Sequence, residues 1–163
     1  LALEIVPEFY YHLGRAYLAS GHLDEAETSF RKMMELTTVG IAQYHLWETL
    51  LVKGDLEAAL AESDSDFRRA VTHHALGNTV KADEALANII EHARPYGLAA
   101  VYGYRGDVDK TFEWLDHALK NGDKYPTFIL AETAFRSVQS DPRWAVFLEK
   151  LDLLEYWHAM TLD

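Results

Sequence analysis

The sequence predicts an all-α protein built from antiparallel helix pairs, and two patterns carry this expectation. Apolar residues recur every three or four positions through most of the chain, as they do along the buried face of a helix. A glycine ends several of these stretches, and a small residue follows it five positions later, inside the next stretch. Glycine suits the residue just past a helix end because it adopts positive φ without strain. A small residue at a fixed offset indicates a close helix crossing. The four glycine–small pairs are Gly21 with Ala26, Gly54 with Ala59, Gly77 with Ala82, and Gly106 with Thr111.

The composition fits a single folded domain covering residues 1–163. Apolar residues make up 49% of the chain, which is enough to build a core. The sequence holds 26 acidic and 15 basic side chains, for a formal charge of −11. It has no cysteine, which excludes disulfides, iron–sulfur clusters and cysteine-ligated zinc.

Charge patterning argues against nucleic acid and membrane as partners. Basic residues occur at most two in a row, so no positive stripe exists to follow a phosphate backbone. The longest charge-free stretches have 11 residues, whereas a spanning helix needs about 18 or more. The start of the chain carries Glu4 and Glu8 without a basic lead-in, unlike a signal peptide. We therefore expect a cytoplasmic protein, and since the chain begins with Leu1, we expect further sequence before it.

The first helix pair has the most specific pattern. Its first helix carries Tyr10, Leu13, Gly14 and Tyr17 at spacings of three, one and three, and Ala26 and Phe30 follow at a spacing of four on the second helix. This order resembles the tetratricopeptide repeat, a helix–turn–helix unit of about 34 residues. Tyr10 and Thr38 stand where that family usually has Trp and Pro. The resemblance implies a short right-handed solenoid of helix pairs that binds other proteins.

The later repeats are less regular. The four loop glycines lie 33, 23 and 29 residues apart, and we place the repeats at about 7–40, 41–63, 64–94 and 95–122. In the second repeat, the offset that places Phe30 in the first one falls on Ser63. The second helix of that repeat is therefore expected to be cut to about two turns. We expect Asp64 or Ser65 to cap a short helix over 66–76.

The last segment, 123–163, is expected to form a C-terminal cap. Asp141 and Pro142 are suited to the N-cap and first position of a capping helix, and Trp144 begins its apolar face. The order of residues from 130 to 148 resembles a cap found in tetratricopeptide regions of bacterial multidomain proteins. In those proteins a nucleotide-cyclase or winged-helix regulator domain lies upstream. The resemblance implies an alternative role for the chain as a regulatory or sensory module of a larger bacterial protein.

No catalytic constellation is found. Cysteine is absent, and the sequence has no His-Glu-x-x-His motif, glycine-rich phosphate loop or Gly-x-Ser-x-Gly turn. The eight histidines are scattered, and the adjacent His73 and His74 would point about 100° apart on a helix, so they cannot clamp one metal ion. We predict no enzymatic activity, no catalytic residue, no metal and no cofactor.

The candidate site lies on the first helix of each pair. Counting back ten residues from each loop glycine reaches an aromatic residue in all four repeats, and offsets of nine and six add histidine and arginine in the early repeats. In the family that the chain resembles, the first helices line a concave groove that holds a peptide or helix of a partner. These aromatics either pack between repeats or form a binding surface, and Tyr and Arg are enriched at binding hot spots. The predicted groove residues are Tyr11, His12, Arg15, Tyr44, His45, Glu48, Phe67, Arg68 and Tyr96.

Two narrower expectations concern partners. The family's clamp for a C-terminal carboxylate needs basic and amide residues at five places, and only one of them matches here, which is Arg68. We therefore do not expect that ligand. The five places hold Tyr11, Arg15, His45, Asp64 and Arg68. The tail 151–160 is rich in large apolar residues. It either folds back onto the last repeats or leaves an exposed patch that would favour a homodimer.

Overall fold

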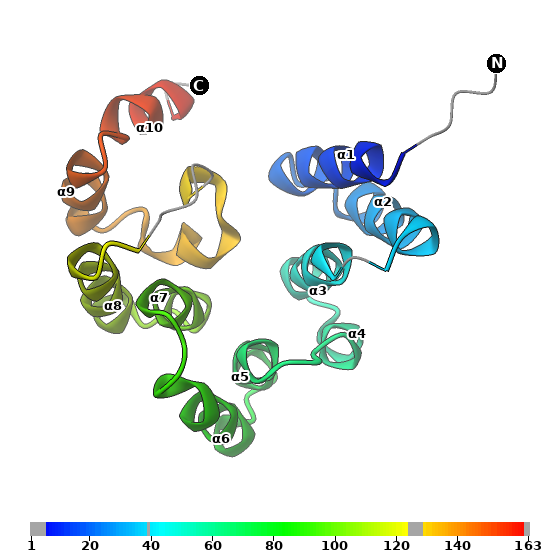
Figure 1. Cartoon of the computed structure of the whole chain (residues 1–163), viewed down its shortest axis with the longest axis horizontal. Coiled ribbons are helices and arrows are strands. Elements are labelled where there is room, and N and C mark those ends of the chain that lie inside the picture. The colour runs from blue at the N-terminus through cyan, green and yellow to red at the C-terminus, as the bar shows by residue number, and fades with distance from the viewer. Residues whose placement is uncertain (1–5, 39, 124–128, 162–163) are drawn as a thin grey trace. The chain divides into compact units, whose positions relative to one another are not determined.

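The structure is a computed structural model that describes residues 6–38, 40–123 and 129–161. This part of the chain is helical and contains no strand, so the predicted all-α class is confirmed (Figure 1). Adjacent helices run antiparallel in pairs. The α-helices are α1 (Pro7–Ala19), α2 (Leu23–Leu36), α3 (Ile41–Lys53), α4 (Leu56–Ala61), α5 (Asp66–Ala75), α6 (Thr79–Ile90), α7 (Pro95–Tyr104), α8 (Val108–Lys120), α9 (Pro142–Lys150) and α10 (Leu154–Met160), and two 3-10 helices, η1 (Ile129–Ala131) and η2 (Thr133–Val138), lie between α8 and α9.

The chain divides into two compact units, Leu1–Asn88 and Ile89–Asp163. The first unit contains α1 to α5 and most of α6, and the second contains α7 to α10 with both 3-10 helices. The boundary falls within the last turn of α6. Each unit is described by itself.

The loop glycines end helices as predicted. Gly21, Gly54, Gly77 and Gly106 all have positive φ, between 73° and 83°. Gly122, after α8, has the same conformation. This left-handed geometry strains any residue with a Cβ, which explains the choice of glycine. The small residues five positions later, which are Ala26, Ala59, Ala82 and Thr111, are all fully buried, as expected at helix crossings.

The first unit begins with the tightest of its helix contacts. Helices α1 and α2 lie side by side (Figure 1), and the fully buried ring of Phe30 sits directly over Gly14. A Cβ at Gly14 would lie 2.7 Å from Cε1 of that ring, closer than non-bonded carbon atoms approach each other. Glycine at position 14 therefore opens the space that the ring occupies.

The shortened second pair is stabilised by a polar network in place of an apolar one. Helix α4 has only six residues, as the predicted two turns require. Ser63, at the place of Phe30 in the first repeat, is buried and donates to the carbonyl of Ala59 at 2.8 Å. Its hydroxyl also lies 3.1 Å from Oγ1 of Thr72, which accepts a 2.8 Å hydrogen bond from the indole of Trp47. Ser65 then caps α5, as predicted.

In the second unit, the backbone of η2 packs directly against helix α7. Gly103 of α7 faces η2, and a Cβ there would lie 2.3 Å from the carbonyl oxygen of Ala134. The hydroxyl of Ser137 donates to the carbonyl of Gly103 at 2.8 Å. Neither of the 3-10 helices η1 and η2 was predicted from the sequence. Residues 124–128 of the predicted cap lie outside the described residues.

The capping helix α9 starts as predicted. Pro142 is its first residue, and the Asp141 carboxylate accepts from the backbone N–H of Arg143 at 2.9 Å. Trp144 is buried against the rings of Phe135 and Phe147, at centroid distances of 5.9 Å each. No described residue accepts a hydrogen bond from its indole nitrogen.

The sequence left open whether the apolar tail folds back or stays exposed, and the tail does both in part. Trp157 of α10 folds back, with its ring edge-on to Trp144 at 6.3 Å. Tyr156 and Met160 face outward, with 65% and 58% of their surface exposed. Homodimerisation through this tail stays a prediction.

Candidate protein-binding face

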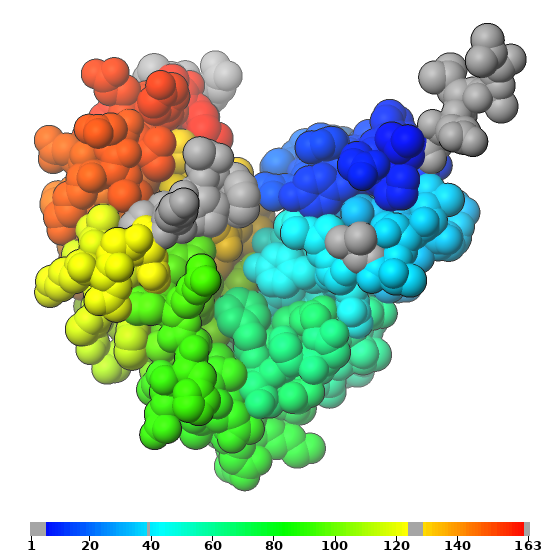
Figure 2. Space-filling model, in the orientation of Figure 1, coloured from blue at the N-terminus to red at the C-terminus, as the bar shows by residue number. Residues whose placement is uncertain are grey.

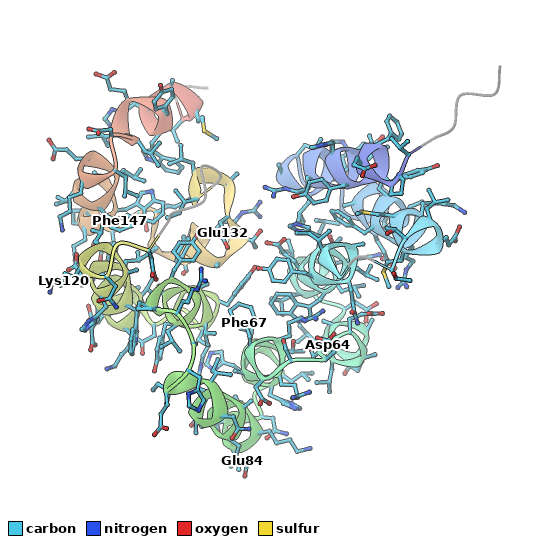
Figure 3. The ribbon with its side chains drawn as sticks, in the orientation of Figure 1. Asp64, Phe67, Glu84, Lys120, Glu132 and Phe147 are labelled. Atoms are coloured by element: carbon cyan, nitrogen blue, oxygen red, sulfur yellow. The ribbon has the colours of Figure 1, made fainter. Side chains whose placement is uncertain are left out.

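In the first unit, side-chain contacts connect the predicted residues of α1 with those of α3, and those of α3 with those of α5. The ring of Tyr11 on α1 lies 5.6 Å from the ring of His45 on α3. The ring of Tyr44 on α3 lies 6.5 Å from that of Phe67, which is labelled at the start of α5 in Figure 3. We call the surface formed by Tyr11, His12, Arg15, Tyr44 and Phe67 the α1–α3–α5 face.

His45 lies beneath this face and connects its parts. Its ring stacks on Phe30 of α2 at 5.3 Å and also contacts the rings of Tyr11 and Tyr44. Nδ1 of His45 lies 2.9 Å from Oε2 of Glu48, and the two residues are only 6% and 5% exposed. Burial of either polar group without a partner would be costly, so the pair satisfies itself inside the unit. His45 therefore supports the rings of Tyr11 and Tyr44 from below, and Glu48 fixes the ring of His45.

Helix α1 contributes the polar part of the face. His12 is exposed, with its ring against that of Tyr11 at 5.1 Å. Arg15 is half-buried, and its guanidinium donates to the Tyr11 hydroxyl at 3.3 Å. These contacts restrict the rotamers of Tyr11 and Arg15.

Helix α5 contributes the aromatic ring of Phe67 to the face, whereas the positive charge of Arg68 on the same helix is neutralised by an ion pair. Phe67 is half-buried and lies edge-on to Trp47 at 5.9 Å. Arg68 is buried, forms an ion pair with Asp64, and donates to the carbonyl of Glu62 at 3.0 Å. Arg68 therefore fixes the α4–α5 connection and presents little charge at the surface.

Tyr96 belongs to the second unit. Its backbone N–H donates to the Asp123 carboxylate at 3.3 Å, and its hydroxyl donates to Glu132. Its ring lies 5.6 Å from that of Phe135. In this unit Tyr96 ties α7 to η1 and η2, where Glu132 is labelled in Figure 3. The other eight predicted residues lie in the first unit.

The outer helix α2 is charged, and most of its charges are paired. Glu27 accepts from Lys53 at 3.1 Å and from Arg31 at 2.9 Å. Partial burial raises the pKa of Glu27, but these two hydrogen bonds outweigh it and hold the pKa below the ordinary value. Lys32 and Glu35 form a further exposed pair, which raises the pKa of Lys32. Exposed pairs of this kind contribute little stability.

The described residues offer no metal centre, since no three His, Asp or Glu side chains converge on one point. The adjacent His73 and His74 each have a buried Nδ1 without a partner among the described residues.

The sequence interpretation missed Trp47, which supports Phe67 from below and is itself fully buried. Its position three residues after Tyr44, on the same side of the helix, was the available signal.

The comparisons with known proteins place one part of the chain in a class. Residues 7–37, which cover α1 and α2, match the tetratricopeptide repeat family. Repeats of this family are generally protein–protein interaction modules and serve as non-catalytic scaffolds. Neither the comparison with curated proteins nor that with solved structures gives a match. In the described residues, no helix has the length and apolar character needed to cross a membrane.

The matched segment is the one whose motif is the most complete. The regular Tyr-x2-Leu-Gly-x2-Tyr order and the buried Gly14–Phe30 contact both lie inside it. The resemblance of residues 130–148 to caps of bacterial regulators is not tested by these findings and stays a prediction.

Proposed function

We propose that the chain is a non-enzymatic scaffold that binds a peptide or helix of a partner protein on the α1–α3–α5 face. The observation that carries this proposal is the state of the three aromatic rings Tyr11, Tyr44 and Phe67. Each is half-buried, and each is backed by fully or nearly fully buried side chains. Half-buried aromatic rings held by neighbouring side chains supply contact area at low entropic cost, which is typical of binding hot spots.

The chemistry of the face suggests the chemistry of the partner. Tyr11, Tyr44 and Phe67 favour aromatic or aliphatic side chains, while His12 and Arg15 are hydrogen-bond donors. The face thus differs from the acidic protein as a whole, which carries a formal charge of −11. We propose a partner segment that combines apolar side chains with carboxylate or carbonyl acceptors, in the cytoplasm of a bacterium.

The same face serves the alternative proposal, in which the chain is a regulatory module of a larger bacterial protein. In that case the ligand bound by Tyr11 and Tyr44 changes the activity of a cyclase or transcription-regulator domain. The support for this alternative is the residue order of the cap, including Asp141 and Pro142 at the start of α9.

The test compares partner binding by variants of the face and of the outer helix. A partner captured by the tagged chain is identified, purified and titrated by calorimetry against Y11A/Y44A and against the control R31A/K32A on α2. We expect the first variant to bind at least about tenfold more weakly, since hot-spot truncations cost more than about 1.4 kcal/mol. The control should bind like the unmodified chain.

Circular dichroism separates binding from packing. If Y11A/Y44A loses its helicity or its cooperative melting, the rings serve the core, and the proposed binding role is wrong. If both variants bind equally well, the partner uses another surface.

A further inference from the structure

The end of helix α8 carries the only Asn-Gly pair of the sequence, Asn121-Gly122. Such a pair is chemically reactive, because the backbone nitrogen of the glycine attacks the side-chain amide carbon of the asparagine, and glycine has no side chain to hinder this attack. Both residues are exposed and directly follow Lys120, which is labelled in Figure 3. The end of α8, yellow in Figure 2, lies at the surface of the second unit.

The other two asparagines of the chain provide an internal comparison. Each is followed by a β-branched residue, which crowds the attacking nitrogen. Each also holds its amide in a hydrogen bond, since Oδ1 of Asn78 accepts from the backbone N–H of Lys81 at 3.4 Å and Nδ2 of Asn88 donates to Asp66 at 3.3 Å. The amide of Asn121 makes no hydrogen bond with a described residue. Sequence and surroundings therefore both make Asn121 the most reactive of the three.

The folded conformation keeps the two reacting atoms apart. Because ψ of Asn121 is −3°, the nitrogen of Gly122 eclipses the backbone nitrogen of Asn121, whereas the attack needs it to eclipse Cβ. The N–H of Gly122 donates to the carbonyl of Leu119 at 3.1 Å, and that of Asp123 donates to the carbonyl of Ala118 at 3.0 Å. These two bonds form a Schellman motif around the positive φ of Gly122. The reaction therefore requires this last turn of α8 to open.

The same turn also caps a second helix. Arg94, the N-cap residue of α7, makes no capping hydrogen bond with its side chain. Instead, the carboxylate of Asp123 accepts from the backbone N–H of Tyr96, in the first turn of α7, at 3.3 Å. The position of this carboxylate depends on the main chain at Asn121 and Gly122, which lead directly into Asp123. A chemical change at Asn121 therefore affects the start of α7 as well as the end of α8.

We propose that Asn121 is a site of spontaneous deamidation that is gated by the last turn of α8, and that its isoaspartyl product releases the start of α7. When the turn opens, the nitrogen of Gly122 loses its proton to solvent and forms a bond to Cγ of Asn121. The bond from Cγ to Nδ2 breaks, and Nδ2 leaves as ammonia after taking a proton from solvent. Water then opens the cyclic imide. Attack of water at Cγ gives aspartate, whereas attack at the main-chain carbonyl carbon breaks its bond to the nitrogen of Gly122 and gives isoaspartate.

Isoaspartate changes the length of the main chain. The chain then runs through Cβ and Cγ of residue 121, which adds one carbon before Gly122, so the two hydrogen bonds of the Schellman motif lose their register. Both products also add a negative charge at the C-terminal end of α8, where the helix dipole disfavours it. The carboxylate of Asp123 then no longer holds the N–H of Tyr96. The inference does not depend on the α1–α3–α5 face, which lies in the first unit.

The first experiment measures the deamidation rates of all three asparagines by peptide mapping with mass spectrometry. The chain is incubated at mildly alkaline pH, either folded or in concentrated guanidinium chloride. We expect Asn121 to react at least about tenfold faster in guanidinium chloride, because the turn then no longer has to open. In both states it should react faster than Asn78 and Asn88. Equal rates of Asn121 in the two states would overturn the gating, and a rate no higher than those of the other two would overturn the site.

Asp123→Ala tests the connection to α7. It removes the hydrogen bond to Tyr96, so we expect it to raise the rate at Asn121 in the folded chain about two- to fivefold and to leave the rate in guanidinium chloride unchanged. The control is Glu113→Ala, which removes an exposed carboxylate of α8 that pairs with Lys110. It should change neither rate. An Asp123→Ala variant that behaves like this control, or that changes both rates equally, would contradict the connection.

Hydrogen–deuterium exchange tests the effect of the product. The added charge lets ion-exchange chromatography separate the aged chain from the unmodified one, and electron-transfer fragmentation identifies the isoaspartyl fraction. We expect exchange in the first turn of α7 to be about fivefold faster in this fraction, with α9 unchanged. N121D carries the charge without the added carbon and should show a smaller effect. Unchanged exchange in α7 would overturn the release, and an equal effect of N121D would assign it to charge alone, against the proposal.

Discussion

Each unit has a glycine inside a helix at a place where another element packs closely against that helix, and the two places differ in what the glycine faces. In the first unit, Gly14 makes room for the side chain of Phe30, whereas in the second, Gly103 makes room for the backbone of Ala134. A side chain can shift by a few tenths of an ångström, but a backbone carbonyl moves only with its segment. The comparison teaches that the same residue type, placed inside a helix for the same steric reason, is not equally replaceable in the two units.

The largest expected effect is that of Gly103→Ala. The added methyl group would lie 2.3 Å from the carbonyl oxygen of Ala134, so η2 must move away from α7. We expect a loss of about 3 kcal/mol in the free energy of unfolding, the upper range for overpacking. The control is Gly97→Ala in the same helix, where the methyl group meets nothing within 4 Å. Denaturant unfolding should show this control to be about 0.5–1 kcal/mol more stable than the unmodified chain.

Gly14→Ala should cost less, about 1–2 kcal/mol, because the obstacle is the ring of Phe30. The double variant Gly14→Ala/Phe30→Leu tests this reason, since the smaller side chain leaves room for the methyl group. In a thermodynamic cycle of unfolding free energies, we expect the two changes to be less harmful together than their sum. Simple additivity would mean that the ring and the glycine do not constrain each other.

The two buried tryptophans extend the comparison to hydrogen bonding. The indole of Trp47 donates to Thr72 at 2.8 Å, whereas that of Trp144 has no acceptor among the described residues. Trp47→Phe and Trp144→Phe remove the same atoms from sites of nearly equal burial. We expect Trp47→Phe to be more destabilising by about 1 kcal/mol, the net contribution of one hydrogen bond. Chemical denaturation of both variants checks this, and equal losses would contradict it.

The smallest effect concerns the start of α9. Hydrogen bonds from the side chain and the backbone of Arg143 lower the pKa of Asp141 from 3.8 to about 2. A carboxylate with a lowered pKa stabilises the folded state above its unfolded pKa, and this contribution fades as the pH falls from about 3.8 through about 2. Thermal melts between pH 5 and 2 should bring the unmodified chain and Asp141→Asn closer together as the pH falls, because Asn keeps the cap without the charge. A constant difference would argue against the ion pair as the cause.

Much of the fold was predictable from local chemistry. Gly54 at a helix end, the short α4 and the cap at Ser65 follow from rules that act within a few residues, and all three are confirmed. The 3-10 helices of the second unit were not predicted, because their position depends on the fit of Ala134 against Gly103, a contact between residues 31 positions apart. Sequence spacing does not report such a fit.

The candidate site was predictable only in part. Counting from the loop glycines identified Tyr11, Tyr44 and Phe67, which share one side of the first unit. The counting could not show that His45 and Glu48 pair below the surface or that Asp64 neutralises Arg68. Burial and pairing depend on neighbouring helices, whereas the count depends only on position within one helix.

The most direct test of the proposed binding face is hydrogen–deuterium exchange of the chain with and without its captured partner. We expect the partner to slow exchange in α1, α3 and α5, over residues 7–19, 41–53 and 66–75, with little change in α4. Added protection in α1 and α2 without any in α3 and α5 would instead show that the partner uses another surface of the first unit. Protection confined to the second unit would contradict the account.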